Sequence, residues 1–420
     1  MQPPPVLGAL PFAGLLLSLA LVPMLAPRLW PRRLGVIALF WSAAFLIPLT
    51  LHTGPRAALA EAWQALLTAY LPFVSLLLAL YAAAGGILIR GGPGGTPASN
   101  TAWLAAGTLL AGAIGTTGAS MVLIRPLLRA NAHRARKIHL VVAFILLVGN
   151  AGGVLSPLGD PPLYLGFLQG VPFFWPLRHL AWPLAVFALP LLLGFYLLDR
   201  REAAAAPPPA PRRPLRLRGR GNVALIAIIN LAVLGQAAWH PGAVRLFGAD
   251  IAGERLAASL LFLAIAWLAS VTTPLAVREA NFFAWAPIVE IAELFPAIFI
   301  TIAPVLALLA ARHEAAFSPG VTFWASGLTA AFLDNAPTYL IFFRQAGGEG
   351  LPPEAVLAAI SAGAVFFGGL TYIGNAPNMM IRTIAAQRGV RMPRFFGYAG
   401  RAALALIPAL GLVWAVFFWQ

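Results

Sequence analysis

The chain has 420 residues, of which 60 % are hydrophobic and only 10 % are charged. Soluble domains carry about 25 % charged residues, so this composition excludes an ordinary water-soluble globule and predicts a polytopic membrane protein in contact with lipid. The absence of cysteine excludes disulfides, Cys-ligated zinc, iron–sulfur clusters and thiol nucleophiles. The formal net charge of +15 lies in short clusters between apolar runs, so we assign it to membrane topology and not to nucleic acid binding.

Ten apolar runs of about 20 residues predict membrane-spanning helices. In chain order they cover residues 7–26, 34–51, 62–89, 138–169, 178–198, 222–239, 256–277, 294–311, 353–381 and 396–419. Two further apolar stretches, 101–124 and 320–343, are interrupted by GTTGAS at 115–120 and DNAP at 334–337. Because these interruptions break a helix, we expect two re-entrant hairpins there.

The positive charges of the loops support the hairpins. Cations cluster at residues 28–33, 125–137, 200–220 and 382–394. All four clusters lie on the cytoplasmic side only if both interrupted stretches enter and leave the membrane at the same face. The pattern predicts a multi-pass integral protein, located in the inner (plasma) membrane if the source is a bacterium.

The sequence also predicts an inverted repeat. Residues 200–221, rich in Pro, Ala and Arg, form a cytoplasmic linker between a first repeat, 1–199, and a second, 222–420. Each half contains three spans, a hairpin (101–124 or 320–343), a broken helix (138–169 or 353–381) and a final span. LSPLGDPP at 155–162 aligns with LTYIGNAP at 370–377, at equivalent places in the two halves. The fold class is therefore an all-α polytopic membrane protein with two inverted repeats, about ten transmembrane helices, two re-entrant hairpins and two broken helices, a plan typical of secondary transporters.

Asp160 stands in G-D-P-P inside an apolar span, where a charge costs at least about 2.5–3.5 kcal/mol. An Asp followed by Pro suits the start of a half-helix running from 161 to 169, so the sequence favours a capping role. An ion-binding role is compatible with capping. The partial positive charge of a half-helix N-terminus attracts anions, and a carboxylate placed there makes the local charge negative.

The second half carries its own intramembrane carboxylate. Asn375 replaces Asp160 in G-N-A-P, while Asp334 appears in the hairpin as L-D-N-A-P. We treat both aspartates as candidate sodium ligands. Further oxygens that suit a hard cation come from the hairpins and breaks. Each alone is more typical of a local backbone partner, and their clustering favours an ion site: Asn150, Asn335, Asn378, Thr116, Thr117, Ser120, Ser156, Thr338 and Thr371.

Other polar residues carry less information. Glu290 and Glu293 lie at a predicted cytoplasmic entrance, where an acidic turn at the interface is the favoured interpretation. No His pair has zinc-ligand spacing, and no phosphate-binding glycine loop is present, which argues against an ATP-driven pump. We expect no cofactor other than the transported or coupling ions, sodium and protons.

The runs NAGGVLSPLGDPP at 150–162, LDNAP at 333–337 and TYIGNAPN at 371–378 resemble the citrate-transporter-like members of the ion transporter superfamily, particularly the NhaD-type sodium/proton antiporters. The resemblance implies an elevator-type carrier, often dimeric, with ions at the hairpin tips and breaks. It would place Asn150, Ser156, Asp160, Asp334, Asn335 and Asn375 at the site. The first hairpin tip departs from the antiporter pattern, because GTTGAS replaces an Asp-Asn pair.

The leading hypothesis is a sodium (cation)/proton antiporter, since two buried carboxylates can bind either ion and so couple them by competition. The runner-up is a sodium- or proton-coupled carrier of citrate or another di- or tricarboxylate. Against the runner-up, no arginine is expected near a predicted break to pair with a substrate carboxylate. An intramembrane aspartyl protease is a remote third candidate, because an inverted repeat gives it no explanation; we therefore expect no enzyme activity.

Overall fold

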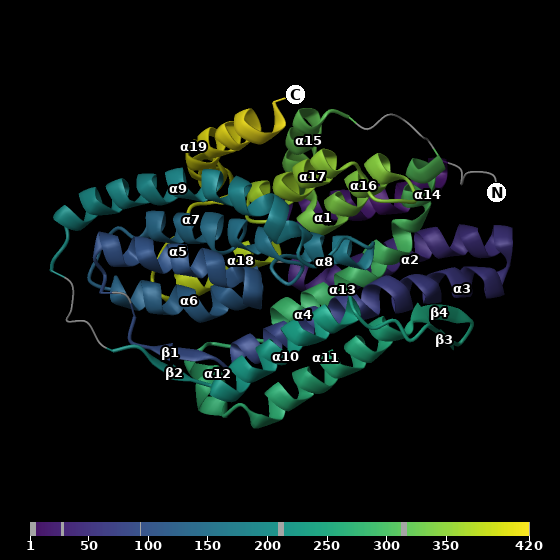
Figure 1. The fold of residues 1–420 in the computed structure, drawn as a ribbon, viewed down its shortest axis with the longest axis horizontal. Helices are drawn as coiled ribbons and strands as arrows, with labels where there is room; N and C mark the ends of the chain where they lie inside the picture. The colour runs from purple at the N-terminus through teal and green to yellow at the C-terminus, as the bar shows by residue number, and fades with distance from the viewer. Residues whose placement is uncertain (1–5, 27–28, 93, 209–213, 312–316, 420) are drawn as a thin grey trace.

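The computed structural model describes residues 6–26, 29–92, 94–208, 214–311 and 317–419. Arg28 of the first cation cluster and residues 209–213 of the linker lie outside these ranges. The described chain is a bundle of helices with two short antiparallel strand pairs at its edge (Figure 1).

The helices confirm an all-α polytopic membrane protein. Seven helical segments of the described chain are long and apolar enough to cross a membrane, and three shorter apolar helices accompany them. Each of these ten segments overlaps one of the ten predicted spans. The helices outside the interrupted regions are α1 (Leu10–Leu25), α2 (Trp30–Thr53), α3 (Pro55–Ala65), α4 (Leu71–Gly85), α9 (Trp175–Ala204), α10 (Arg220–Gln236), α11 (Gly253–Thr272), α12 (Leu275–Ala280), α13 (Ala286–Thr301), α14 (Ala303–Ala311) and α19 (Phe395–Val413). A 3₁₀ turn at Val6–Ala9 precedes α1, a π turn at Leu66–Tyr70 joins α3 to α4, and a π turn at Trp414–Phe418 follows α19.

Each interrupted stretch forms two helices joined at one residue. In the first, α5 (Pro97–Ile114) and α6 (Thr116–Ala130) meet at Gly115, with φ +78°. In the second, α15 (Pro319–Leu333) and α16 (Asn335–Gly347) meet at Asp334, with φ +75°. The partner helices pack against each other in both pairs. Gly suits this backbone conformation, whereas Asp adopts it at a cost of about 1–3 kcal/mol, so the second hairpin stores strain at its tip.

Both broken helices contain a 3₁₀ turn and an extended residue. The first comprises α7 (Ile138–Leu147), the turn Ala151–Leu155 and α8 (Pro161–Leu168). The second comprises α17 (Glu354–Phe366), the turn Phe367–Leu370 and α18 (Ala376–Gln387). In Figure 1 the α5–α6 pair lies in the left part of the bundle, and the α15–α16 pair lies above and to the right of it.

Glycines let the backbone pack onto itself at each break. A Cβ added to Gly159 would lie 2.1 Å from the carbonyl oxygen of Gly153, and one added to Gly374 would lie 2.7 Å from that of Gly368. Both distances are shorter than real contacts allow, so these glycines are required for the close approach.

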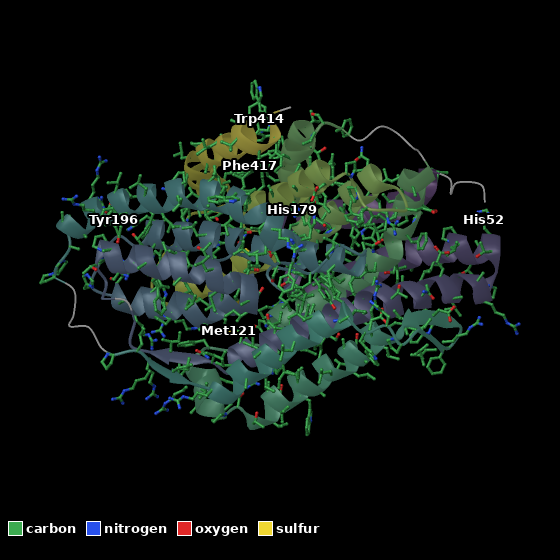
Figure 2. All side chains as sticks on the ribbon, in the orientation of Figure 1. His52, Met121, His179, Tyr196, Trp414 and Phe417 are labelled. Carbon is green, nitrogen blue, oxygen red and sulfur yellow. The ribbon has the colours of Figure 1, made fainter. Side chains whose placement is uncertain are left out.

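The strands lie at the edge of the bundle. β1 (Leu88–Arg90) pairs antiparallel with β2 (Arg216–Arg218), and β3 (Ala243–Leu246) pairs with β4 (Ala249–Ala252). The first pair joins the end of the predicted linker to the first half of the chain. Nitrogen-bearing side chains gather around this end of the bundle, near Tyr196 and the β1–β2 pair (Figure 2).

Candidate functional site

The two hairpins and the two broken helices meet at one buried carboxylate. Asp160, only 2 % exposed, stands directly before α8. Thr116 at the first hairpin tip donates its hydroxyl to Oδ1 at 3.0 Å, and Asn335 at the second tip donates its amide to Oδ2 at 2.5 Å. Asn375, directly before α18, donates to Oδ1 at 2.9 Å. Neutral donors from the other three interrupted elements therefore surround the Asp160 carboxylate.

A chain of amides extends from this carboxylate between the two halves. Asn375 also donates to Oδ1 of Asn150 at 3.2 Å, and Asn150 donates to Oδ1 of Asn378 at 2.8 Å. Asn378 donates to the carbonyl oxygens of Gly368 and Thr371, at 2.7 and 2.9 Å. Because the break leaves these carbonyls without helical partners, the amide of Asn378 replaces the missing backbone bonds.

Two amide oxygens next to Asp160 have no donor. Oδ1 of Asn335 and Oδ1 of Asn375 are buried without a hydrogen-bond partner in the described part of the chain. An unpartnered buried oxygen costs about 1–3 kcal/mol, so the arrangement is incomplete without a further group. Carboxylate and amide oxygens are ligands that hard cations prefer. A cavity of about 30 Å³ adjoins Asp160 and is lined by Thr116 and Thr117 among others, which is room for a water molecule or a small ion.

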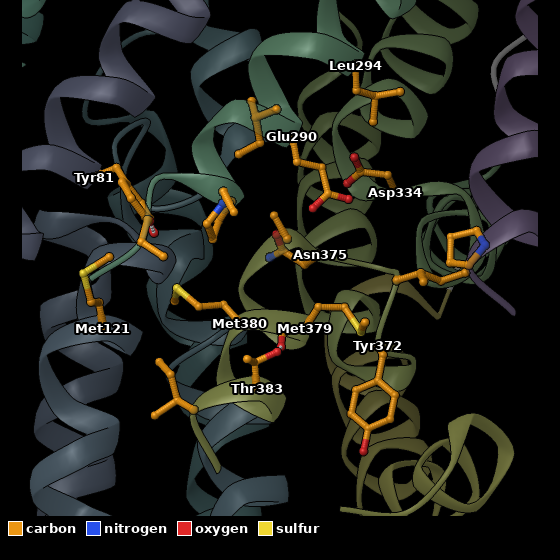
Figure 3. Close-up of a pocket in the computed structure, with 18 of the residues that line it drawn as sticks. Tyr81, Met121, Glu290, Leu294, Asp334, Tyr372, Asn375, Met379, Met380 and Thr383 are labelled. Atoms are coloured by element: carbon orange, nitrogen blue, oxygen red, sulfur yellow. Dashed lines mark hydrogen bonds between the residues drawn. The ribbon is translucent and has the colours of Figure 1, made fainter. Parts of the chain in front are cut away.

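A larger cavity of about 430 Å³ has Asn375 on its wall (Figure 3). Asp334, partly exposed at the second hairpin tip, and Glu290 of α13 both line it. Figure 3 shows their two carboxylates pointing toward each other. Most of the remaining wall is apolar, including Met121, Leu294, Met379 and Met380. The two predicted carboxylates thus line different cavities, and Asn375, which donates to Asp160, lines the large one.

Asp160 and Asn375 occupy N-cap positions without capping. Both have an extended backbone before a helix that carries Pro in its first turn, as the sequence predicts. Neither side chain accepts a hydrogen bond from its own helix. The capping role predicted for the Asp160 side chain is therefore wrong. The carboxylate turns instead toward the hairpin tips, because their donors satisfy both of its oxygens.

Ser156 and Thr371 connect each break to its hairpin. The hydroxyl of Ser156 donates to the carbonyl of Gly112 in α5, and that of Thr371 donates to the carbonyl of Ala331 in α15 at 2.5 Å. Each hydroxyl also accepts a backbone N–H two residues later, from Leu158 and Ile373. Neither hydroxyl contacts Asp160, so we assign both residues to holding the hairpin tips in place.

The remaining hydroxyl candidates lie on α6. Thr117 lines the small cavity. Ser120 is fully buried, and its hydroxyl has no hydrogen-bond partner among the described residues. The hydroxyl that contacts Asp160 belongs to Thr116, one of the candidate hydroxyls that the sequence singles out. The symmetry of the hairpins points to the same residue, because Thr116 follows Gly115 just as Asn335 follows Asp334.

The position of Glu290 differs from the one that the sequence predicts. We expected an acidic turn at the interface, but Glu290 lies within α13 and on the wall of the large cavity. Leu294, four residues later on the same helical face, lines the cavity as well. Glu293 lies against Gly35 of α2 instead. Only one of the two glutamates therefore belongs to the site.

An arginine also lies near a break, contrary to expectation. Arg125 on α6 lines the large cavity together with Asn375. The prediction was wrong because α6 packs against α18. Contacts between segments so distant in the chain leave no pattern in a single sequence.

Comparison with known protein families identifies the family of the chain. A family model, CitMHS_2, described as putative citrate transport, matches residues 2–418. The chain belongs to this family. No curated protein matches the chain. Membership in CitMHS_2 identifies the chain as a secondary transporter of the citrate-transporter-like kind and as a multi-pass membrane protein.

Proposed function

We propose that this CitMHS_2 member is a sodium (cation)/proton antiporter. The observation that carries the proposal is the buried Asp160 carboxylate, with two unpartnered amide oxygens beside it. A sodium ion bound to Asp160 would also be coordinated by these amide oxygens. A proton on the Asp160 carboxylate would compete with the sodium ion for that carboxylate. Asp334 and Glu290 add two acids to the adjoining cavity. We assign Asp160 as the primary ion ligand and Asp334 as a second group on the ion's route.

An elevator-type mechanism fits the packing of the site. Besides the hydroxyl bonds of Ser156 and Thr371, the backbone N–H of Thr116 donates to the carbonyl of Gly159 at 2.8 Å. Each hairpin tip is thus bonded to its own broken helix. We propose that the hairpins and broken helices move as one unit and carry the ion between the two sides of the membrane. We also propose a bacterial inner-membrane location and a homodimeric form.

The second candidate is a sodium- or proton-coupled carrier of citrate or a related anion. The size of the large cavity, about 430 Å³, favours it, because a lone cation needs far less room. The presence of Arg125 on the wall also favours it. Two acids face the same cavity, however, and their charges would repel a citrate anion unless protons or cations neutralised them. We therefore place antiport first.

Solid-supported-membrane electrophysiology on proteoliposomes separates the two candidates. Jumps of sodium, lithium and citrate are applied at two pH values to the wild type and to Asp160→Asn. Antiport predicts currents from sodium or lithium without citrate, and their loss in Asp160→Asn. The matched control is Asp250→Asn, the same chemical change at an exposed carboxylate of the β3–β4 pair, which should behave as wild type. A current that requires citrate would establish the second candidate instead.

A further inference from the structure

Two arginines share one aromatic ring, that of Phe282, which lines the large cavity. The guanidinium of Arg125 on α6 lies 5.8 Å from the ring centroid of Phe282, and that of Arg388, directly after α18, lies 5.2 Å from it. Phe282 itself has φ +47°. The preceding residue, Asn281, holds this loop by donating its amide to the carbonyls of Gly85 and Ile87 at 3.0 and 2.8 Å. The loop that carries the ring is therefore anchored, and both cations lie within 6 Å of the ring centroid.

Neither guanidinium has a counter-charge in the described part of the chain. Arg125 is only 3 % exposed, and its Nη1 donates to the carbonyl of Met121 in its own helix at 2.9 Å. Nε of Arg125 and Nε of Arg388 are both buried without a hydrogen-bond partner, and no ion pair between described residues involves either arginine. A buried unpaired charge costs several kcal/mol.

The surrounding charges make this cost larger. Arg388 and Arg129 both act on the Arg125 guanidinium as like charges. The acids of the same cavity, Asp334 and Glu290, point toward each other in Figure 3. A planar guanidinium with free N–H groups binds the two oxygens of a carboxylate or phosphate in parallel. An anion between the arginines would therefore satisfy several donors at once.

We propose that Arg125 and Arg388 form a binding site for an oxyanion, a carboxylate or a phosphate, next to Phe282. The site is separate from the Asp160 carboxylate and does not depend on the proposed antiport. Because its residues come from α6, the end of α18 and the loop between α12 and α13, a bound oxyanion would bridge the hairpin and broken-helix unit to the helices outside it. The oxyanion has two sources, a small solute such as phosphate or the headgroup of an anionic lipid.

The test measures binding to the purified full chain in nanodiscs of zwitterionic lipid, with inorganic phosphate and citrate as probes in isothermal titration calorimetry. We expect saturable binding, weakened about tenfold or more in Arg125→Gln and in Arg388→Gln, because each removes charge-assisted hydrogen bonds. Arg391→Gln, an exposed arginine on the same segment, is the matched control and should bind as wild type. Asp160→Asn should also bind as wild type, which keeps this proposal distinguishable from the proposed function.

A second arm distinguishes the two sources. If a lipid headgroup occupies the site, nanodiscs that contain phosphatidylglycerol should abolish solute binding and raise the melting temperature of the wild type but not of Arg388→Gln. If the ligand is a free solute, these nanodiscs should change neither solute binding nor the melting temperature. Arg388 is only partly buried, so Arg388→Gln decides the outcome even if Arg125→Gln fails to fold. The proposal is overturned if Arg388→Gln binds as wild type, if Asp160→Asn abolishes oxyanion binding, or if neither the solutes nor the anionic lipid has an effect.

Discussion

Replacing Asp160 by asparagine separates the charge of the site from its hydrogen bonds. The new amide keeps one oxygen for Thr116 and Asn375, and it presents an NH₂ group to Asn335. Oδ1 of Asn335 has no partner in the described chain, so a 180° rotation of its amide turns this contact into a hydrogen bond. The number of hydrogen bonds is then unchanged. We expect Asp160→Asn to alter the free energy of unfolding by less than about 1 kcal/mol.

Asp160→Ala is the contrasting variant. It removes every acceptor, so the buried amides of Asn335 and Asn375 each lose the partner of one N–H, whereas the hydroxyl of Thr116 can rotate toward another acceptor. Each orphaned donor costs about 1–3 kcal/mol, so the two together should destabilise the protein by about 2–6 kcal/mol. Both variants should lose the stabilisation by sodium, because both lack the carboxylate.

Thermal unfolding in detergent, followed through the fluorescence of the 12 tryptophans, measures both effects with and without sodium. Sodium should raise the melting temperature of the wild type and of the control Asp250→Asn, and leave both Asp160 variants unchanged. Equal destabilisation of Asp160→Asn and Asp160→Ala would refute the amide-rotation argument. A sodium-dependent shift that persists in Asp160→Asn would refute Asp160 as the ion ligand.

Three further predictions follow from the breaks and the hairpins. Asp334→Gly should be at least as stable as the wild type, because it relieves about 1–3 kcal/mol of backbone strain at φ +75°. It should nevertheless lose proton-coupled flux. A melting temperature well below that of the wild type would contradict the strain argument. Gly159→Ala should reduce the yield of folded protein in size-exclusion chromatography more than Gly374→Ala does, since its Cβ would meet backbone at 2.1 Å instead of 2.7 Å, and equal yields would count against the packing argument. Single cysteines in place of Ala98 and Ala132 should label from one side of the membrane, and those in place of Phe317 and Glu349 from the other; labelling of Ala98 and Ala132 positions from opposite sides would show that the first hairpin crosses the membrane.

The sequence predicts the elements well, because length and hydropathy are local properties. The ten spans and the interruptions at Gly115 and Asp334 could be located from apolar runs and their helix-breaking residues alone. The pairing of β1 with β2 could not, since it joins segments on either side of five helices and depends on register. Arg125 and Glu290 were missed for a related reason. Their place in the cavity depends on how α6 and α13 are rotated against distant partners, which a single sequence does not contain.

The hydrogen bonds of Asp160 also affect how the chain is made. Its partners Asn335 and Asn375 lie 175 and 215 residues later. At a synthesis rate of about 5–20 residues per second, these residues leave the ribosome about 10–40 s after Asp160 does. During that interval Thr116 is the only one of the three donors already made. The first half therefore waits in the bilayer with an acid that is still missing two of its partners, and a neutral, protonated carboxyl is the form in which it is least costly to hold there.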